Sequence, residues 1–171
     1  APYSAQEVSY RKLLGQLDDR GNTATIAHYL GLLEVAGLMS GLHKYDPKLL
    51  RRRASSPRLL VHDTAFMTAA YGSGREGLLT DASKRGHLVE SAVGAYLLAR
   101  AATDGFEVCW WREGSKEVDF VVSDDRHVTA IEVKSGRVKS TGGLEAFCLE
   151  YPEARTLVVG SAACGVGDFL M

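Results

Sequence analysis

The sequence predicts an α/β fold of two parts: an N-terminal winged helix-turn-helix over residues 1–77, and a mixed sheet flanked by helices over residues 78–171. In the first part, two stretches with helical spacing of apolar residues precede two short strands that a basic loop joins. In the second part, a long helical stretch leads into three runs of β-branched and aromatic residues, then a helix and a last strand. Glycine-rich residues separate the parts, and we place the boundary near Gly77.

Composition narrows the classes of protein to consider. The 171 residues suit one ordinary domain or two small ones, and 20 Lys and Arg against 21 Asp and Glu leave a formal charge of -1. Binding to nucleic acid therefore depends on local clusters of basic residues. The three cysteines lack metal-ligand spacing, which argues against a disulfide scaffold or a zinc site, and no apolar stretch is long enough for a membrane span.

The same features give an expected location. We expect a cytoplasmic protein that has no membrane partner, since cysteine usage fits a reducing compartment and no signal peptide opens the chain. The first residue is Ala1 rather than Met, which leaves open that the chain was cut from a longer parent.

The elements of the first part follow from periodicity, capping residues and turn chemistry. In chain order, we expect a helix over residues 5–17, a turn over 18–22, a helix that begins at the N-cap Thr23, strands over 38–45 and 58–62, a short helix that ends near Ala70, and a linker or surface loop over 71–81. The loop between the two strands forms the wing.

The elements of the second part show a change from helical period to strand period. In chain order, we expect a helix over residues 83–102, strands over 107–112, 116–123 and 128–135, a helix near 144–151, and a strand over 156–159.

Charged and bulky residues alternate along the second and third strands of this sheet. A four-residue loop over residues 124–127 makes them an antiparallel hairpin, whose register sets Asp119 opposite Glu132 and Glu117 opposite Lys134. Because side chains alternate with period two, these four lie on one face, and apolar side chains form the other.

The two opposed acids suggest a metal site. Directly opposed residues have Cβ atoms roughly 4.5–5.5 Å apart, so Asp119 and Glu132 repel each other unless a cation lies between them. Carboxylate oxygens suit Mg²⁺ or Mn²⁺, which keep several waters and accept phosphate oxygens from a substrate. Lys134 on the same face is able to orient a water or to stabilise charge on a phosphate. These are the parts of metal-dependent phosphodiester hydrolysis.

A simpler arrangement of the hairpin is also open. In it Lys134 pairs with Glu117, while Asp119 and Glu132 point into water from an exposed strand pair. Glu90 bears on the choice, since it lies in an apolar helical stretch, where a carboxylate that faces the core needs a partner. A third acid beside a metal is one explanation of Glu90, and a solvent-facing position is the other.

These residues resemble the motif of a nuclease superfamily. Glu90 on a helix, Asp119 on a strand, and Glu132 and Lys134 on the next strand resemble the PD-(D/E)XK superfamily, which has the restriction-endonuclease-like fold. The resemblance implies that these four residues are catalytic and that Asp119, Glu132 and Glu90 hold Mg²⁺ or Mn²⁺. It implies a DNA endonuclease-like activity, in which Lys134 orients water or stabilises charge.

More closely, nearly the whole chain resembles the DUF4143-type C-terminal region of predicted prokaryotic AAA-type ATPases. Four segments carry this resemblance: SPRLLVHDT at 56–64, GHLVE at 86–90, the tryptophan pair at 110–111 and GLEAF at 143–147. It implies a winged-helix segment before a nuclease-like domain, with the ATPase domain of the same parent chain as a partner. The phosphate-binding motif G-x-x-x-x-G-K-[ST] is missing from the sequence, so we expect no ATP binding by this chain.

A basic cluster near the wing is a candidate DNA contact. In helix-turn-helix proteins the second helix enters the major groove while nearby basic residues hold phosphates. A solvated loop, or a surface that docks onto the ATPase, is equally open. The candidate nucleic-acid contacts are Arg51, Arg52, Arg53, Arg58, Thr25 and His28.

Two functions of different classes therefore stand side by side. The first is a Mg²⁺-dependent endonuclease-like phosphodiester hydrolase that acts on DNA through a winged-helix segment. The second is a non-catalytic DNA- or protein-binding module that serves the ATPase and keeps the acidic site as a remnant of the fold.

Overall fold

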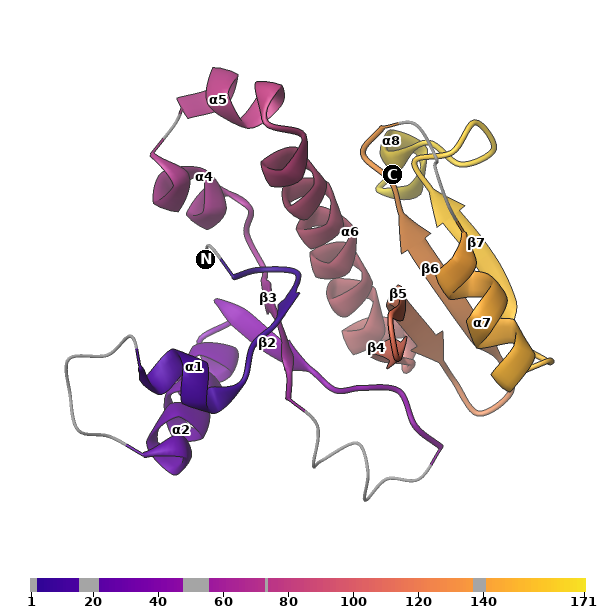
Figure 1. The fold of residues 1–171 in the computed structure, drawn as a ribbon, viewed down its shortest axis with the longest axis horizontal. Coiled ribbons are helices and arrows are strands. Elements are labelled where there is room, and N and C mark those ends of the chain that lie inside the picture. The colour runs from indigo at the N-terminus through magenta and orange to yellow at the C-terminus, as the bar shows by residue number, and fades with distance from the viewer. Residues whose placement is uncertain (1–2, 16–21, 48–55, 73, 137–140) are drawn as a thin grey trace.

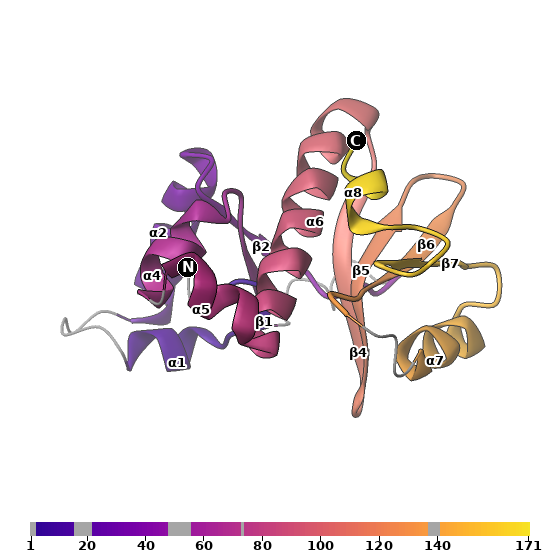
Figure 2. The ribbon, with the colours of Figure 1, turned by 90° about the horizontal axis from the view of Figure 1, so that it is seen from above.

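The computed structural model describes residues 3–15, 22–47, 56–72, 74–136 and 141–171. The fold is mixed α/β, with two separate sheets and one long helix, α6 (Ala82–Asp104), between them (Figures 1 and 2). The first sheet has the strand order β1 (Gln6–Glu7), β3 (Arg58–Val61), β2 (Met39–Leu42), and the second has the order β4 (Glu107–Glu113), β5 (Lys116–Ser123), β6 (Val128–Val133), β7 (Arg155–Val159). Among the described residues, no helix combines the length and apolar character that a bilayer crossing needs.

The N-terminal helix is shorter than the sequence predicts. Residues 6–7 form β1, which pairs antiparallel with β3, and Ala5 N–H donates to Leu59 O at 2.8 Å. Helix α1 (Tyr10–Leu14) begins only after the N-cap Ser9. The prediction of a helix from residue 5 is wrong because pairing with a strand some 50 residues later holds this segment extended, whatever its local periodicity.

The second helix starts close to its predicted position. Helix α2 (Thr23–Val35) is capped by Asn22, whose Oδ1 accepts from Thr25 N–H at 3.0 Å in a capping box, so the cap lies one residue before the predicted Thr23. Strands β2 and β3 pair antiparallel, with Met39 opposite Val61. The two strands predicted around the basic loop are thus confirmed, and the loop itself, residues 48–55, lies outside the described residues together with Arg51, Arg52 and Arg53.

The glycine-rich stretch between the parts contains helices. Helix α4 (Ala65–Tyr71) ends at Gly72, which has the left-handed φ of 62°, and α5 (Gly74–Thr80) follows directly. The predicted linker or surface loop is wrong over residues 74–80. Met67 of α4 and Leu78 of α5 are buried, so packing decides the structure here despite the glycines. The boundary that we placed near Gly77 falls inside α5.

The larger sheet agrees closely with the sequence prediction. Strands β4, β5 and β6 are antiparallel, and helix α7 (Gly142–Glu150) provides the crossover to β7, which is parallel to β6. The β5–β6 pairs run from Ser123 opposite Val128 to Phe120 opposite Ile131, which confirms the predicted register over these four pairs, next to the loop. The chain closes with helix α8 (Val166–Phe169).

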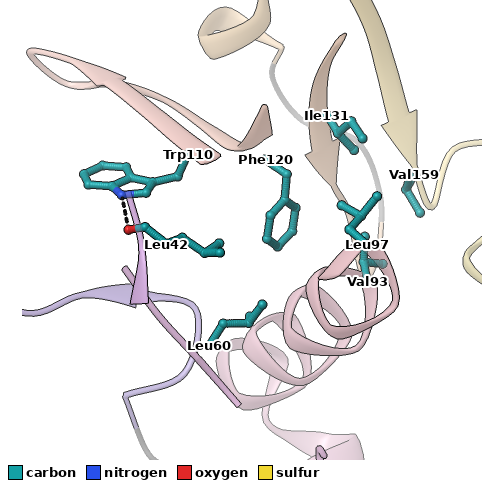
Figure 3. Packing of buried hydrophobic residues seen from close by; sticks show 8 residues of the cluster. All are labelled: Leu42, Leu60, Val93, Leu97, Trp110, Phe120, Ile131 and Val159. Carbon is teal, nitrogen blue, oxygen red and sulfur yellow. Dashed lines mark hydrogen bonds between the residues drawn. The ribbon is translucent and has the colours of Figure 1, made fainter. Parts of the chain in front are cut away.

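One hydrophobic core joins the two parts. Leu42 and Leu60 of the first sheet pack with Val93 of α6 and Phe120 of the larger sheet (Figure 3). The full set of buried residues in this cluster is Leu42, Leu60, Val93, Leu97, Trp110, Phe120, Ile131 and Val159. The first sheet therefore lies against α6 and β5, and this places β3 beside the predicted site.

Candidate functional site

The four predicted site residues line one cavity. Glu90 comes from the middle of α6, Asp119 from β5, Glu132 from the end of β6, and Lys134 directly follows β6. The cavity has a volume of about 520 Å³, and His87 also lines it, one helical turn before Glu90. Residues separated by up to 44 positions in the chain are thus brought together, as the motif predicted.

Asp119 is held by the backbone of the next strand. Its Oδ2 accepts from Val133 N–H at 2.8 Å, which directs the carboxylate toward the end of β6. Burial, and then the charge of Glu132, raise the pKa of Asp119 to about 6, although the Val133 amide, Arg58 and Lys134 act in the opposite direction. The neighbouring positive charges are therefore too few to offset the cost of ionising Asp119 in this buried position.

Glu90 faces the interior rather than solvent. Its side chain is 14% exposed, and burial, followed by the charge of Asp119, raises its pKa well above the ordinary value, with Arg58 opposing the shift. The solvent-facing alternative for Glu90 is wrong. The helix turns this carboxylate toward β5, and a buried acid of this kind needs a cation or a proton.

The simpler arrangement of the hairpin is not the one observed. Lys134 Nζ donates to Glu132 Oε1, whereas Glu117 forms ion pairs with Arg58 and Arg112. The side chains of Asp119 and Glu132 are 16% and 13% exposed, so neither carboxylate points into water.

Arg58 lies in the interior, not on the surface as a phosphate contact would require. It is 4% exposed, and its Nη1 lies 3.1 Å from Glu90 Oε1 and 3.8 Å from Asp119 Oδ1. Its Nη2 is paired with Glu117, and its guanidinium stands 5.6 Å from the ring centre of Trp110. The expectation of a surface phosphate contact overlooked these acids, because only the tertiary structure brings β3 to them. The one sequence signal was a charged residue at the start of an apolar strand.

The remaining DNA-contact candidates on α2 have ordinary surroundings. Thr25 takes part in the capping box of α2, and His28 is exposed next to Tyr29. The helix contains no Lys or Arg, and its exposed face carries Tyr29, Leu32 and Val35. A helix without basic residues, whose exposed residues also include Glu34, offers few phosphate contacts.

The chemistry of the site fits a hard divalent cation. Glu90 Oε1 and Glu132 Oε2 are buried and have no hydrogen-bond partner among the described residues. Carboxylate oxygens are the donors that Mg²⁺ and Mn²⁺ prefer. Within the described ranges no three His, Cys, Asp or Glu side chains already converge as a metal-binding group, so a bound ion requires these side chains to turn.

The lining of the cavity is acidic on balance. Three carboxyl groups line it, those of Glu90, Asp119 and Glu132, against the two basic side chains of Arg85 and Lys134.

Comparison with known proteins gives two family matches. No curated protein and no solved structure matches the chain. Residues 1–77 match the model of a family described as a domain of unknown function, DUF8612. Residues 85–164 match the family model described as a domain of unknown function, DUF4143, which confirms the DUF4143 part of the predicted resemblance for the segment that carries Glu90, Asp119, Glu132 and Lys134.

Proposed function

We propose that the chain is a metal-dependent phosphodiester hydrolase of the PD-(D/E)XK type that acts on DNA. The observation that carries the proposal is the cavity between α6 and the β5–β6 hairpin, where acids with raised pKa values are buried. In this cavity Glu132 Oε2 has no hydrogen-bond partner among the described residues, and Glu90 Oε1 has only the ion pair with Arg58. Acids whose charge the protein only partly compensates are typical of functional sites. The resemblance of the chain to the C-terminal region of an AAA-type ATPase suggests that the site works beside an ATPase domain.

Each residue has a role in this proposal. Asp119 and Glu132 hold Mg²⁺ or Mn²⁺, and Glu90 supplies a third carboxylate from α6. When bound, the ion supplies Lewis acidity toward a phosphodiester and lowers the pKa of a bound water. Lys134, whose Nζ already lies beside Glu132, orients the attacking water or stabilises charge on the phosphate.

A plasmid-nicking assay with Mg²⁺ or Mn²⁺ tests this function. We expect nicking by the wild-type chain that is lost in Asp119→Ala and in Lys134→Ala. The matched controls are Asp125→Ala and Lys116→Ala, which alter exposed residues of the same hairpin and keep wild-type activity. Equal background nicking by all five proteins contradicts the hydrolase.

A second candidate function, a protein-binding module, is favoured by α2. Leu32 is 53% exposed and Val35 is 90% exposed on a helix without basic residues. Exposed apolar residues grouped on one helix are typical of protein interfaces. In this case a separately expressed ATPase domain of the parent chain binds this chain, and Leu32→Glu weakens the binding about tenfold or more. Leu149→Glu, at an exposed position of α7, serves as the control. Unchanged affinity of Leu32→Glu contradicts this role for α2.

DNA binding by the wing arginines stays a proposal, since they lie outside the described residues. If Arg52 contacts a phosphate, Arg52→Ala reduces the slope of log K against log salt by about 1. An unchanged slope removes this contact.

A further inference from the structure

Strand β3 places the buried guanidinium of Arg58 beside acids of α6 and β5. All four residues of β3 are buried, and Leu60 packs against Phe120 and α6 in the shared core (Figure 3). Arg58 and Leu60 lie on the same face of the strand because side chains alternate with period two. The packing of Leu60 thus brings Arg58 next to Asp119, the residue before Phe120.

The guanidinium of Arg58 is shared among three acids. It approaches Glu90 and Asp119 through Nη1, pairs with Glu117 through Nη2, and also donates from Nη1 to the backbone oxygen of Asp119 at 3.0 Å. The Trp110 ring lies 5.6 Å from its Cζ. Removing one partner from a buried ion pair is strongly destabilising, because it leaves uncompensated charge in the interior.

Two of these acids are the ones that the proposed function assigns to a metal. Glu90 and Asp119 form ion pairs with Arg58, whereas the ion pair of Glu132 in the described part of the chain is with Lys134. A guanidinium and a divalent ion cannot both approach the same oxygens closely, since like charges repel and each displaces the other's partners.

We propose that Arg58 is the internal counter-ion of the acidic site: it holds Glu90 and Asp119 before a metal binds, and it competes with a divalent cation for them. This inference rests on the proposed function. Arg58 belongs to the segment that matches DUF8612, whereas the acids belong to the segment that matches DUF4143. The first part of the chain therefore contributes a positioning residue to the site of the second part and sets its affinity for metal.

The test compares metal binding in variants of Arg58 in the full chain. Arg58→Met removes the charge at similar length, and Arg58→Lys keeps the charge without the forked geometry. The control is Arg100→Met, on the exposed side of α6, where Arg100 pairs with Asp104. Melting temperature and calorimetric Kd are measured on chelator-treated protein, with and without Mg²⁺ and Mn²⁺.

The proposal predicts that loss of the Arg58 charge lowers the stability of the metal-free protein and raises its affinity for Mg²⁺. Arg58→Met melts below wild type without metal, gains more stability from Mg²⁺ than wild type does, and binds Mg²⁺ about fivefold or more tightly. Arg58→Lys falls between the two, and Arg100→Met follows wild type in its response to metal. A residue that only fills the core would not change the response to Mg²⁺.

The outcomes separate this inference from the proposed function. If wild type binds Mg²⁺ while Arg58→Met loses the same stability in both conditions and keeps the wild-type Kd, the inference fails and the function stands. If Arg58→Met is unfolded without metal, recovery of its fold by Mg²⁺ supports the inference. If it stays unfolded with Mg²⁺ and Arg58→Lys has the wild-type Kd, the inference is overturned. If wild type binds neither Mg²⁺ nor Mn²⁺, the proposed function fails and this inference fails with it.

Discussion

Asp119 carries a carboxyl group whose interior position favours the protonated form. Its pKa in the folded chain is about 6, against about 3.9 for an unfolded aspartate. Between these values the folded state binds more protons than the unfolded state, so the free energy of unfolding falls as pH rises from about 4 to about 6. A shift of about two pKa units corresponds to about 3 kcal/mol.

Asp119→Asn removes this dependence. Asparagine keeps an oxygen that accepts from Val133 N–H and has no charge to titrate. Urea unfolding of the chelator-treated chain at pH 4.5, 6 and 7.5 measures the effect, with exposed Asp125→Asn as the control. We expect the variant to gain stability over wild type as pH rises. Parallel pH curves for wild type and Asp119→Asn contradict the interior position of the acid.

Among the elements, strand β7 fixes the backbone of Lys134. Gly160 follows β7 with a φ of +88°, and a Cβ there would lie 1.9 Å from the backbone oxygen of Lys134. Gly160→Ala therefore adds a strained φ to a direct clash, at a cost of about 2 kcal/mol or more. Because the clash displaces the residue that carries the site lysine, we also expect weaker Mg²⁺ binding.

The control for Gly160 lies at the same end of the sheet. A Cβ at Gly136 meets nothing within 4 Å, so Gly136→Ala leaves the free energy of unfolding close to wild type. Urea unfolding and calorimetry measure both variants. Equal changes in the free energy of unfolding for the two variants would show that the close approach of Gly160 to Lys134 does not contribute to stability.

Helix α6 depends on a glycine to reach the first sheet. A Cβ on Gly94 would lie 2.7 Å from side-chain atoms of Leu60 and Phe120. Overpacking of this kind costs about 1–3 kcal/mol, so Gly94→Ala lowers the free energy of unfolding. Gly31 of α2 has open space around it, and Gly31→Ala raises the free energy of unfolding by up to about 1 kcal/mol through helix propensity. Denaturation curves that move in the same direction for both variants contradict this packing.

Buried contacts join the two halves of the molecule, although these halves match different families. Tyr45 N–H donates to Trp110 O at 2.6 Å, and Leu60 is fully buried beside α6 and Phe120. Both tryptophans of the chain, Trp110 and Trp111, lie in the second half. We expect Leu60→Ala, in the first half, to lower the free energy of unfolding by about 2–5 kcal/mol when unfolding is followed by tryptophan fluorescence. A fluorescence transition that stays at wild-type denaturant concentration, while circular dichroism changes, shows instead that the halves unfold independently.

The sequence predicted best those features that depend on local pattern. The β5–β6 register follows from the alternation of charged and apolar residues and from the short loop at residues 124–127, and the structure confirms it. The motif positions Glu90, Asp119, Glu132 and Lys134 share a cavity because a helix and two adjacent strands have regular geometry.

The features that were missed depend on distant partners. Residues 6–7 became a strand because β3 provides hydrogen bonds to them, and residues 74–80 became a helix although glycine favours turns. Arg58 was grouped with the wing arginines because nothing near it in the chain marks Glu90 or Asp119 as its partners. A pattern of local residues cannot contain pairings that only the packed core creates.

The most direct test of the acidic site is to locate an ion in it. A crystal of the chain soaked in Mn²⁺ and measured at the manganese absorption edge gives an anomalous peak wherever the ion binds. We predict a peak within coordination distance, about 2.0–2.3 Å, of carboxylate oxygens of Asp119 and Glu132, and its loss in Asp119→Asn. A well-ordered cavity with no peak at millimolar Mn²⁺, and with Arg58 still paired to Glu90 and Asp119, contradicts the metal site and the hydrolase built on it.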